Sequence, residues 1–193
     1  MALYLSGDPE ADAFLSQDPL ALLIGMVLDQ QVPLERAFSS PRDLRDRLGG
    51  QLDAGAIAAM DPGELEEVFS QRPALHRFPA SNAGRVRQLC QIIVSDYGGD
   101  AASVWEGASS GTDLLRRVRA LPGFGEQKAK IFVALLGKQL GVRPSGWQEV
   151  SKPFGDKGTH SSVADITSKE SLLRVRAHKA EIKAAAKAKA STA

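Results

Sequence analysis

The stretch LLRRVRALPGFGEQKAKIFVALLG, residues 114–137, decides the fold of this chain. Apolar residues recur at helical spacing on both sides of LPGFG at 121–125, so the sequence predicts two helices joined by a tight turn, a hairpin spanning residues 112–136. Glycine adopts positive φ readily and lets the backbone approach a ligand closely, and Phe124 is expected to pack inward and lock the turn. The first amides of the second helix would then face solvent without partners, which suits a phosphate group. A plain helical hairpin with glycine as a C-cap is the alternative.

The rest of the chain also predicts helices. Asp18-Pro19 and Asp61-Pro62 each pair a good N-cap residue with a proline in the first helical position. Helical spacing of apolar residues continues through 86–94, and no segment alternates with period two. The predicted fold class is therefore all-α.

Three segments predict where a helix breaks, where turns replace helix, and where the last helix begins. Pro41 lacks the amide that continues a helix, so Ser40-Pro41 predicts a break between two helices. Residues 141–165 are rich in Gly, Pro and Ser, which predicts a long functional loop or a set of short turns. Thr167 and Glu170 match a capping box before the last helix.

Length and composition indicate one compact unit. The chain has 193 residues, 43% hydrophobic and 24% charged, which is ordinary for a globular protein. We expect residues 1–182 to form a single domain and residues 183–193 a basic, disordered tail. No stretch approaches the ~20 apolar residues of a membrane span, and the first residues lack a signal-peptide pattern. Cys90 is the one cysteine, so we expect neither a disulfide framework nor a four-cysteine metal site, and a cytoplasmic location.

The charge of the chain is divided unevenly. Residues 1–67 hold 13 acids and 4 bases, a net of −9, whereas residues 68–193 hold 10 acids and 20 bases, a net of +10. A basic half favours a polyanionic partner, and nucleic acid is the commonest. The basic stretch SLLRVRAHKAEIKAAAKAKA at 171–190 would either follow a phosphate backbone or serve as a solubilising tail.

Taken with its neighbours, the hairpin resembles the helix-hairpin-helix of the HhH-GPD superfamily of base-excision-repair DNA glycosylases. LALLIGMVLDQQVPLERAF at 20–38 is similar to the apolar helix of that family that ends in Gln-Gln. SNAGRVRQLCQIIVSDYGG at 81–99 is similar to the helix that precedes its hairpin. The likeness spans residues 15–140 and implies a two-lobed helical fold.

The resemblance implies a monomeric enzyme that binds double-stranded DNA, flips a damaged or mispaired base into a cleft between two lobes and cleaves its N-glycosidic bond. It implies no iron–sulfur cluster here, and it leaves open whether a monovalent cation binds the hairpin carbonyls. In a bacterium such a protein would be associated with the nucleoid. The residues expected to contact DNA are Leu121, Pro122, Gly123, Phe124, Gly125, Lys128, Lys130, Gln30 and Gln31.

The catalytic residue departs from the family pattern. The family's aspartate falls on residues 146–148 here, where no acid stands, and Gln127 occupies the position of the lysine that forms a Schiff base in bifunctional members. We expect a monofunctional glycosylase. The carboxylates that could replace the missing aspartate are Glu149, which is nearest to that position, and Asp156 and Asp165 further along the chain. Glu149 ranks first and Asp165 second among them; the alternative is that no carboxylate is catalytic.

Trp147 is an aromatic candidate for contact with the base. It would either stack on an extruded base or fill the core beneath its loop.

The main alternative to a catalytic function is a non-catalytic helix-hairpin-helix protein that recognises damaged or distorted DNA. A protein–protein adaptor built on a helical hairpin is the third reading, and it needs no basic half. His76, His160 and His178 lack paired metal-ligand spacing, so no metal is expected.

Overall fold

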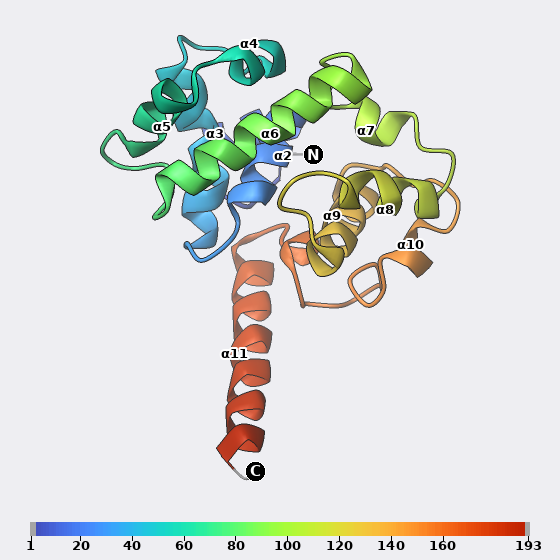
Figure 1. Ribbon diagram of the computed structural model, residues 1–193. Helices are drawn as coiled ribbons and strands as arrows, with labels where there is room; N and C mark the ends of the chain where they lie inside the picture. Colours follow the sequence, from blue (N-terminus) through green and yellow to red (C-terminus); the bar gives the residue numbers. More distant parts are fainter. Residues whose placement is uncertain (1–2, 192–193) are drawn as a thin grey trace.

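A computed structural model describes residues 3–191, with side chains to residue 188 (Figure 1). This part of the chain forms eleven α-helices and one 3₁₀-helix and contains no strand, so the predicted all-α class is confirmed. The helices are α1 (Pro9–Gln17), α2 (Pro19–Leu28), α3 (Leu34–Arg47), α4 (Ala54–Ala59), α5 (Pro62–Ser70), α6 (Pro79–Tyr97), α7 (Ser103–Glu106), α8 (Gly111–Arg119), α9 (Glu126–Gln139), α10 (Trp147–Val150), η1 (Val163–Asp165) and α11 (Lys169–Ser191).

The Asp-Pro pairs begin helices as predicted. The Asp18 carboxylate accepts a hydrogen bond from the Ala21 amide at 2.9 Å at the start of α2. Asp61 does the same for Gly63 at 2.8 Å at the start of α5. Proline at the first helical position has no amide to leave unbonded, so each pair defines a helix start locally.

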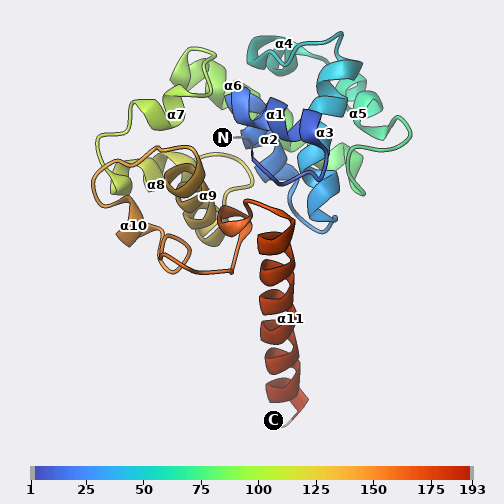
Figure 2. The ribbon, with the colours of Figure 1, turned by 180° about the vertical axis from the view of Figure 1, so that it is seen from behind.

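Helix α2 forms the centre of the first half of the molecule. Every residue from Leu20 to Leu28 is buried, and α1, α3 and α6 pack around it, as Figures 1 and 2 show from opposite sides. Among residues 3–191, no single helix has the length and apolar composition to cross a membrane; α1 and α2 would meet that test jointly, but they are bent by 116°. The apolar character of α2 is satisfied by burial within the protein.

The predicted break at Pro41 is wrong, because α3 continues through it. Proline inside a helix costs roughly 3 kcal/mol through its missing amide and its steric clash. Here Pro41 is itself buried, and the adjacent Ser40 hydroxyl donates to the carbonyls of Arg36 at 2.7 Å and Leu75 at 2.8 Å. Burial of Phe38 and Leu44 on the same helix offsets the local cost.

The second half of the molecule consists of α7 to α11. Helices α8 and α9 form the predicted hairpin, and α10 and η1 pack against α9. Segment 141–165 is a series of short turns around α10 and η1, which agrees with the second of the two predicted forms. The buried side chains of both halves belong to one continuous hydrophobic core.

Helix α11 extends away from the rest of the molecule in Figures 1 and 2. Its start is capped by Ser168 and Ser171, each of which accepts a hydrogen bond from the other's amide, and not by the predicted pair Thr167 and Glu170. The helix continues to Ser191, whereas the sequence predicted disorder from residue 183; alanine and lysine have high helix propensity. Residues 192–193 of the predicted tail lie outside the described residues.

Candidate nucleic-acid interface and adjoining cleft

Two apolar side chains hold the turn between α8 and α9. Leu121 and Phe124 are buried, and the ring centroid of Phe124 lies 5.5 Å from that of Phe132 in α9. The Phe124 amide donates to the Leu121 carbonyl at 3.2 Å, and Gly123 between them has a φ of 83°. Phe124 therefore packs inward as predicted, and much of the exposed surface of the turn is backbone.

The backbone amides around this turn are open to a ligand. Within residues 3–191, no acceptor is hydrogen-bonded to the amides of Gly123, Gly125 or the first three residues of α9. Gly123, Gly125, Glu126 and Gln127 are exposed. Unbonded N–H groups at the positive end of a helix dipole form a surface that attracts anions.

The end of α2 and one side of α6 border the hairpin. An ideal Cβ atom on Gly123 would lie 3.0 Å from Cδ of Arg85 in α6 and 3.6 Å from Cγ1 of Val27 in α2. Nη1 of Arg85 donates to Oε1 of Gln30 at 3.2 Å. Gln31 is exposed and has a left-handed φ of 58°. The structure thus brings the two predicted glutamines to the same face as the hairpin, about 90 residues further along the chain.

His76 and Phe78 complete this face, and sequence reasoning missed both. Nδ1 of the buried His76 accepts a hydrogen bond from the Phe78 amide at 3.1 Å, so Nε2 carries the proton and donates to the Gln30 carbonyl at 2.8 Å. Burial lowers the pKa of His76, which favours the neutral ring. Phe78 is 45% exposed, with Cζ of Arg77 at 4.8 Å from its ring centroid. A lone aromatic residue before a helix has no periodic signal that would reveal it.

The two lysines expected to reach phosphates have partners inside the protein. Nζ of Lys128 donates to the Met26 carbonyl at 2.8 Å, because α9 places it against the C-terminal end of α2. Burial lowers the pKa of Lys128, and the negative charge of Asp29 opposes that change. Nζ of Lys130 lies 3.1 Å from the Glu126 carboxylate. The open amides are therefore the stronger anion-binding feature of the hairpin.

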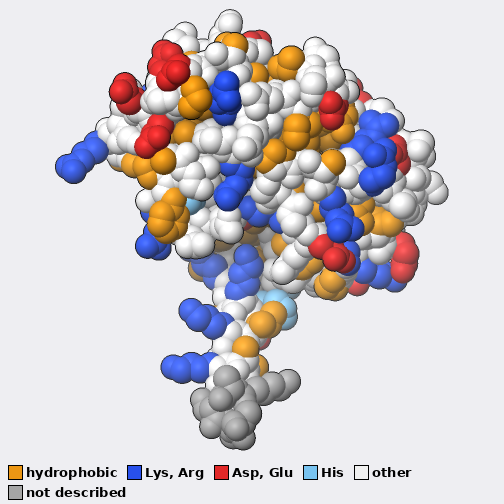
Figure 3. Space-filling model, viewed as in Figure 1, with side chains coloured by type: hydrophobic (Ala, Val, Ile, Leu, Met, Phe, Trp, Pro, Cys, Tyr) orange, Lys and Arg blue, Asp and Glu red, His pale blue; other side chains and the backbone are white. Residues whose placement is uncertain are grey.

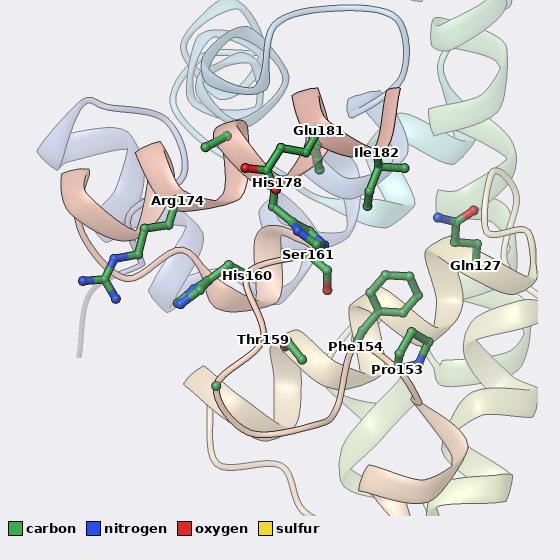
Figure 4. Close-up of a pocket in the computed structure, with 13 residues that line it drawn as sticks. Gln127, Pro153, Phe154, Thr159, His160, Ser161, Arg174, His178, Glu181 and Ile182 are labelled. Atoms are coloured by element: carbon green, nitrogen blue, oxygen red, sulfur yellow. The ribbon is translucent and has the colours of Figure 1, made fainter. Parts of the chain in front are cut away.

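A cleft opens where the first turn of α9 meets α11 and segment 153–161. Its larger cavity has a volume of about 860 Å³, and Figure 4 shows Gln127, Ile182 and the ring of Phe154 around the same space. A smaller cavity of about 280 Å³ adjoins it; Gln127 and Lys179 line both. Gln127 occupies the position at which the family resemblance places a Schiff-base lysine in bifunctional members. It therefore lies between the hairpin amides and the cleft.

Two polar atoms in the wall of the larger cavity have no partner. Nδ1 of His160 and Oγ of Ser161 are buried, and neither has a hydrogen-bond partner among the described residues. Both residues line the cavity together with His178 (Figure 4). Buried polar groups are ordinarily bonded, so these two atoms leave hydrogen-bonding capacity unused in residues that line the cavity.

Asp29 lies in the smaller cavity, directly after the wholly buried α2. Lys128 and Lys179 line the same cavity, yet no described residue forms a hydrogen bond or ion pair with the Asp29 carboxylate. Burial raises the pKa of Asp29, and the positive charges of the two lysines oppose that rise. Sequence reasoning missed this residue; the available signal was an acid at the end of an otherwise apolar helix.

The two predicted catalytic carboxylates have other surroundings. Glu149 in α10 has a side chain that is 75% exposed and pairs with Lys152 at 2.7 Å, and it lines neither cavity. Asp165 has a side chain that is only 5% exposed; it accepts hydrogen bonds from Nζ of Lys138 at 2.6 Å and from the Ser161 amide at 2.8 Å. Its carboxylate connects η1 to α9, so both oxygens are already bonded within the protein.

Trp147 packs against α9. An ideal Cβ atom on Gly137 would lie only 2.3 Å from Cε3 of the Trp147 ring, so the ring occupies the space that this glycine leaves. Close packing of α10 on α9 through this pair matches the second of the two predicted roles, the filling of space beneath the loop.

The charge division of the sequence is visible on the surface. In Figure 3, acidic side chains gather over α5, whereas Lys and Arg side chains follow α11. Among residues 3–191, no group of three or more His, Cys, Asp or Glu side chains is placed to hold a metal ion.

Comparison with known proteins gives one match. No individual curated protein and no solved structure matches the chain. The match is to the family described as HhH-GPD superfamily base excision DNA repair protein, over residues 24–192. This region includes the second half of α2, the hairpin, the cleft and α11. Because the match covers most of an all-α chain, the protein belongs to the HhH-GPD superfamily of base excision DNA repair proteins.

Proposed function

We propose that this protein is a monofunctional DNA glycosylase: it binds duplex DNA, extrudes a damaged or mispaired base into the cleft beside Gln127, and hydrolyses the N-glycosidic bond. One observation carries the proposal. The unbonded amides of the hairpin lie next to a cleft of about 860 Å³, and the same residue, Gln127, contributes to both. Membership of a base-excision-repair superfamily supports this assignment.

The hairpin would hold one DNA strand by its phosphates. Amides in front of the α9 dipole bind an anion without regard to base sequence, which positions the duplex on the protein. The basic face of α11 would add charge along the backbone, so affinity should fall steeply with salt.

Base extrusion needs groups that fill the gap left in the duplex. Gln31 and Phe78 are both exposed and line the same small hollow beside the hairpin. An aromatic side chain that enters a base step unstacks it at a cost of a few kcal/mol, and the cost is lowest at a damaged or mispaired site. These two residues are therefore the candidates for wedge and gap filler.

The cleft offers the contacts that an extruded base requires. Phe154 gives it an apolar ring surface for stacking, and a small shift of the His160 and Ser161 side chains would bring their unpartnered atoms to a base edge. The Gln127 carboxamide cannot form a Schiff base with the sugar. Hydrolysis by water would therefore leave an intact abasic strand.

A non-catalytic protein that recognises distorted DNA is the second candidate. One observation favours it: Asp165 is bonded within the protein, and Glu149 lies outside the cavities. A protein that kept the hairpin and lost the carboxylate would bind damaged DNA without cutting it.

Single-turnover excision separates these functions. Excess protein is mixed with duplexes that carry uracil, an alkylated purine, oxidised guanine or a mismatch, and strands are resolved with and without alkali. If the protein is a monofunctional glycosylase, at least one duplex should show strand breaks after alkali treatment and none before it. Tight, salt-dependent binding without product on any duplex identifies the non-catalytic protein. Absence of DNA binding rejects both and leaves the adaptor.

A further inference from the structure

The smaller cavity of the cleft is lined by an acid that forms no hydrogen bond or ion pair with the described residues. Carboxylates buried in proteins are normally paired or hydrogen-bonded, because an isolated buried charge is costly. Asp29 is largely buried and has neither kind of partner among the described residues, although Lys128 and Lys179 line the same cavity. A group retained in this state is typical of a functional site.

The position of Asp29 suits a reaction at the sugar of an extruded nucleotide. The smaller cavity that it lines is continuous with the residues of the larger one through Gln127, Ser161 and Lys179. A nucleotide held at the hairpin by its phosphate, with its base beside Phe154, would have its sugar near Gln127.

The other acid of the cleft is less suited. Glu181 lines the larger cavity from α11, but it is exposed to solvent, whereas Asp29 is mostly covered. An exposed carboxylate is screened by water and interacts weakly with charge that develops on a sugar. The environment thus singles out Asp29 among the acids that line the two cavities.

We infer that Asp29 is the catalytic carboxylate of the proposed glycosylase, in place of the aspartate that the chain lacks after its hairpin. The inference rests on the proposed function. The C1′–N bond breaks, and its electron pair leaves with the base, so positive charge develops on the sugar beside the Asp29 carboxylate. Water then adds to C1′ and gives one proton to Asp29, the departing base nitrogen takes a proton from solvent, and Asp29 releases its proton to solvent at the end of the cycle.

Lys128 and Lys179 would keep Asp29 ionised in the protein before substrate binds. Lys128 is held in place by the carbonyl of Met26, and Lys179 approaches from α11. Their positive charges act against the burial that favours the protonated acid. Loss of the Lys179 charge should therefore shift the acidic limb of the pH–rate profile to higher pH.

The test compares Asp29→Asn with Glu149→Gln on the duplex that the wild-type protein cleaves best. Asp29→Asn should lower the single-turnover rate at least about 100-fold, with Tm and DNA affinity retained, and Glu149→Gln should stay within a few-fold of wild type. Asp29→Ala serves as a second variant in case the asparagine protein does not fold. In Lys179→Met, the midpoint of the acidic limb should move upward, a change that a merely structural role would not produce.

The outcomes distinguish this inference from the function on which it rests. Full activity of folded Asp29→Asn or Asp29→Ala protein, or loss of activity in Glu149→Gln alone, overturns the role of Asp29 and leaves the glycosylase standing. Absence of excision by the wild-type protein on every duplex rejects the glycosylase and the role of Asp29 together.

Discussion

At the scale of single residues, Gly123 and Gly125 meet different requirements within one turn. Gly123 has a φ of 83°, so any other residue there would be strained by roughly 1–2 kcal/mol. Gly125 has an ordinary φ of −66°, and an ideal Cβ atom on it has no other atom within 4 Å. A side chain at 125 is therefore compatible with the fold and would occupy only the space in front of the open amides.

Gly125→Ser should weaken DNA binding about tenfold while it leaves Tm unchanged or slightly raised. Serine is a good N-cap residue, and its hydroxyl would accept a hydrogen bond from an amide of the first turn of α9 that otherwise faces a phosphate. Binding titrations at fixed salt and thermal unfolding measure the two effects. Gly123→Ala is the comparison, with an expected loss of stability. Unchanged affinity in folded Gly125→Ser protein would exclude the hairpin as the phosphate site.

At the scale of elements, α9 depends on one glycine for its contact with α10. The Trp147 ring lies where the side chain of residue 137 would otherwise be, so α10 can approach α9 closely. Gly84 lies in the interior of α6 in a contrasting environment, exposed and with nothing within 4 Å of an ideal Cβ atom. Alanine has a higher helix propensity than glycine at both positions. Only at position 137 would its methyl group clash with a neighbour, the Trp147 ring.

Gly137→Ala should lower the free energy of unfolding by about 1–3 kcal/mol, because the new methyl group displaces Trp147. Gly84→Ala should raise it by about 0.5–1 kcal/mol through propensity alone. Denaturant unfolding of both variants at neutral pH measures the difference. A stabilised Gly137→Ala protein would contradict the packing of Trp147 on α9.

Helix α11 is anchored at its start and exposed towards its end. Val175 is buried against the core, and Arg176 forms an ion pair with Glu35 of α3. All side chains from Glu181 to Ala188 are exposed, so they contribute little to folding. The basic side chains of this part lie on the surface of the helix, so we interpret the basic stretch of the sequence as a region that contacts a polyanion.

Truncation after Ile182 should reduce the salt dependence of DNA binding and leave Tm nearly unchanged. The deleted segment carries Lys183, Lys187 and Lys189 and no acid. Removal of one lysine–phosphate ion pair makes the slope of log K against log salt shallower by about 0.9. The full-length protein with Lys183→Gln and Lys187→Gln separates charge from length. An unchanged slope in both proteins would identify the segment as a solubilising tail.

At the scale of the whole molecule, one lysine connects the two halves. Lys128 belongs to the hairpin helix, and its ammonium group donates to the Met26 carbonyl near the end of α2. A positive charge there also interacts favourably with the negative end of the α2 dipole. Lys130, two residues further on, pairs only with Glu126 of its own helix.

Lys128→Met should destabilise the protein by about 1–3 kcal/mol, because the carbonyl at the end of α2 would then have no charged donor. Lys130→Met removes a surface ion pair of the same helix and should cost less than about 1 kcal/mol. Denaturant unfolding of the two variants provides the comparison. Equal, small effects would show that Lys128 does not join the halves.

The elements that could be predicted from the sequence are those with local causes. Asp18 and Asp61 begin helices because a carboxylate and a following proline satisfy the first turn within a few residues. The hairpin at 121–125 follows from turn chemistry and from Phe124, whose apolar neighbours are set by helical spacing. The all-α class follows from the same spacing along the whole chain.

Features that depend on partners far along the chain could not be predicted and emerge from tertiary packing. Pro41 stays within a helix because its surroundings are buried, and Trp147 packs on α9 because residue 137 has no side chain. Lys128 turns away from solvent towards Met26, 102 residues earlier. Asp29 lies in a cleft that exists only once α2, α9 and α11 have come together. Burial and charge pairing act through space, and for these residues neither is encoded in the nearby sequence.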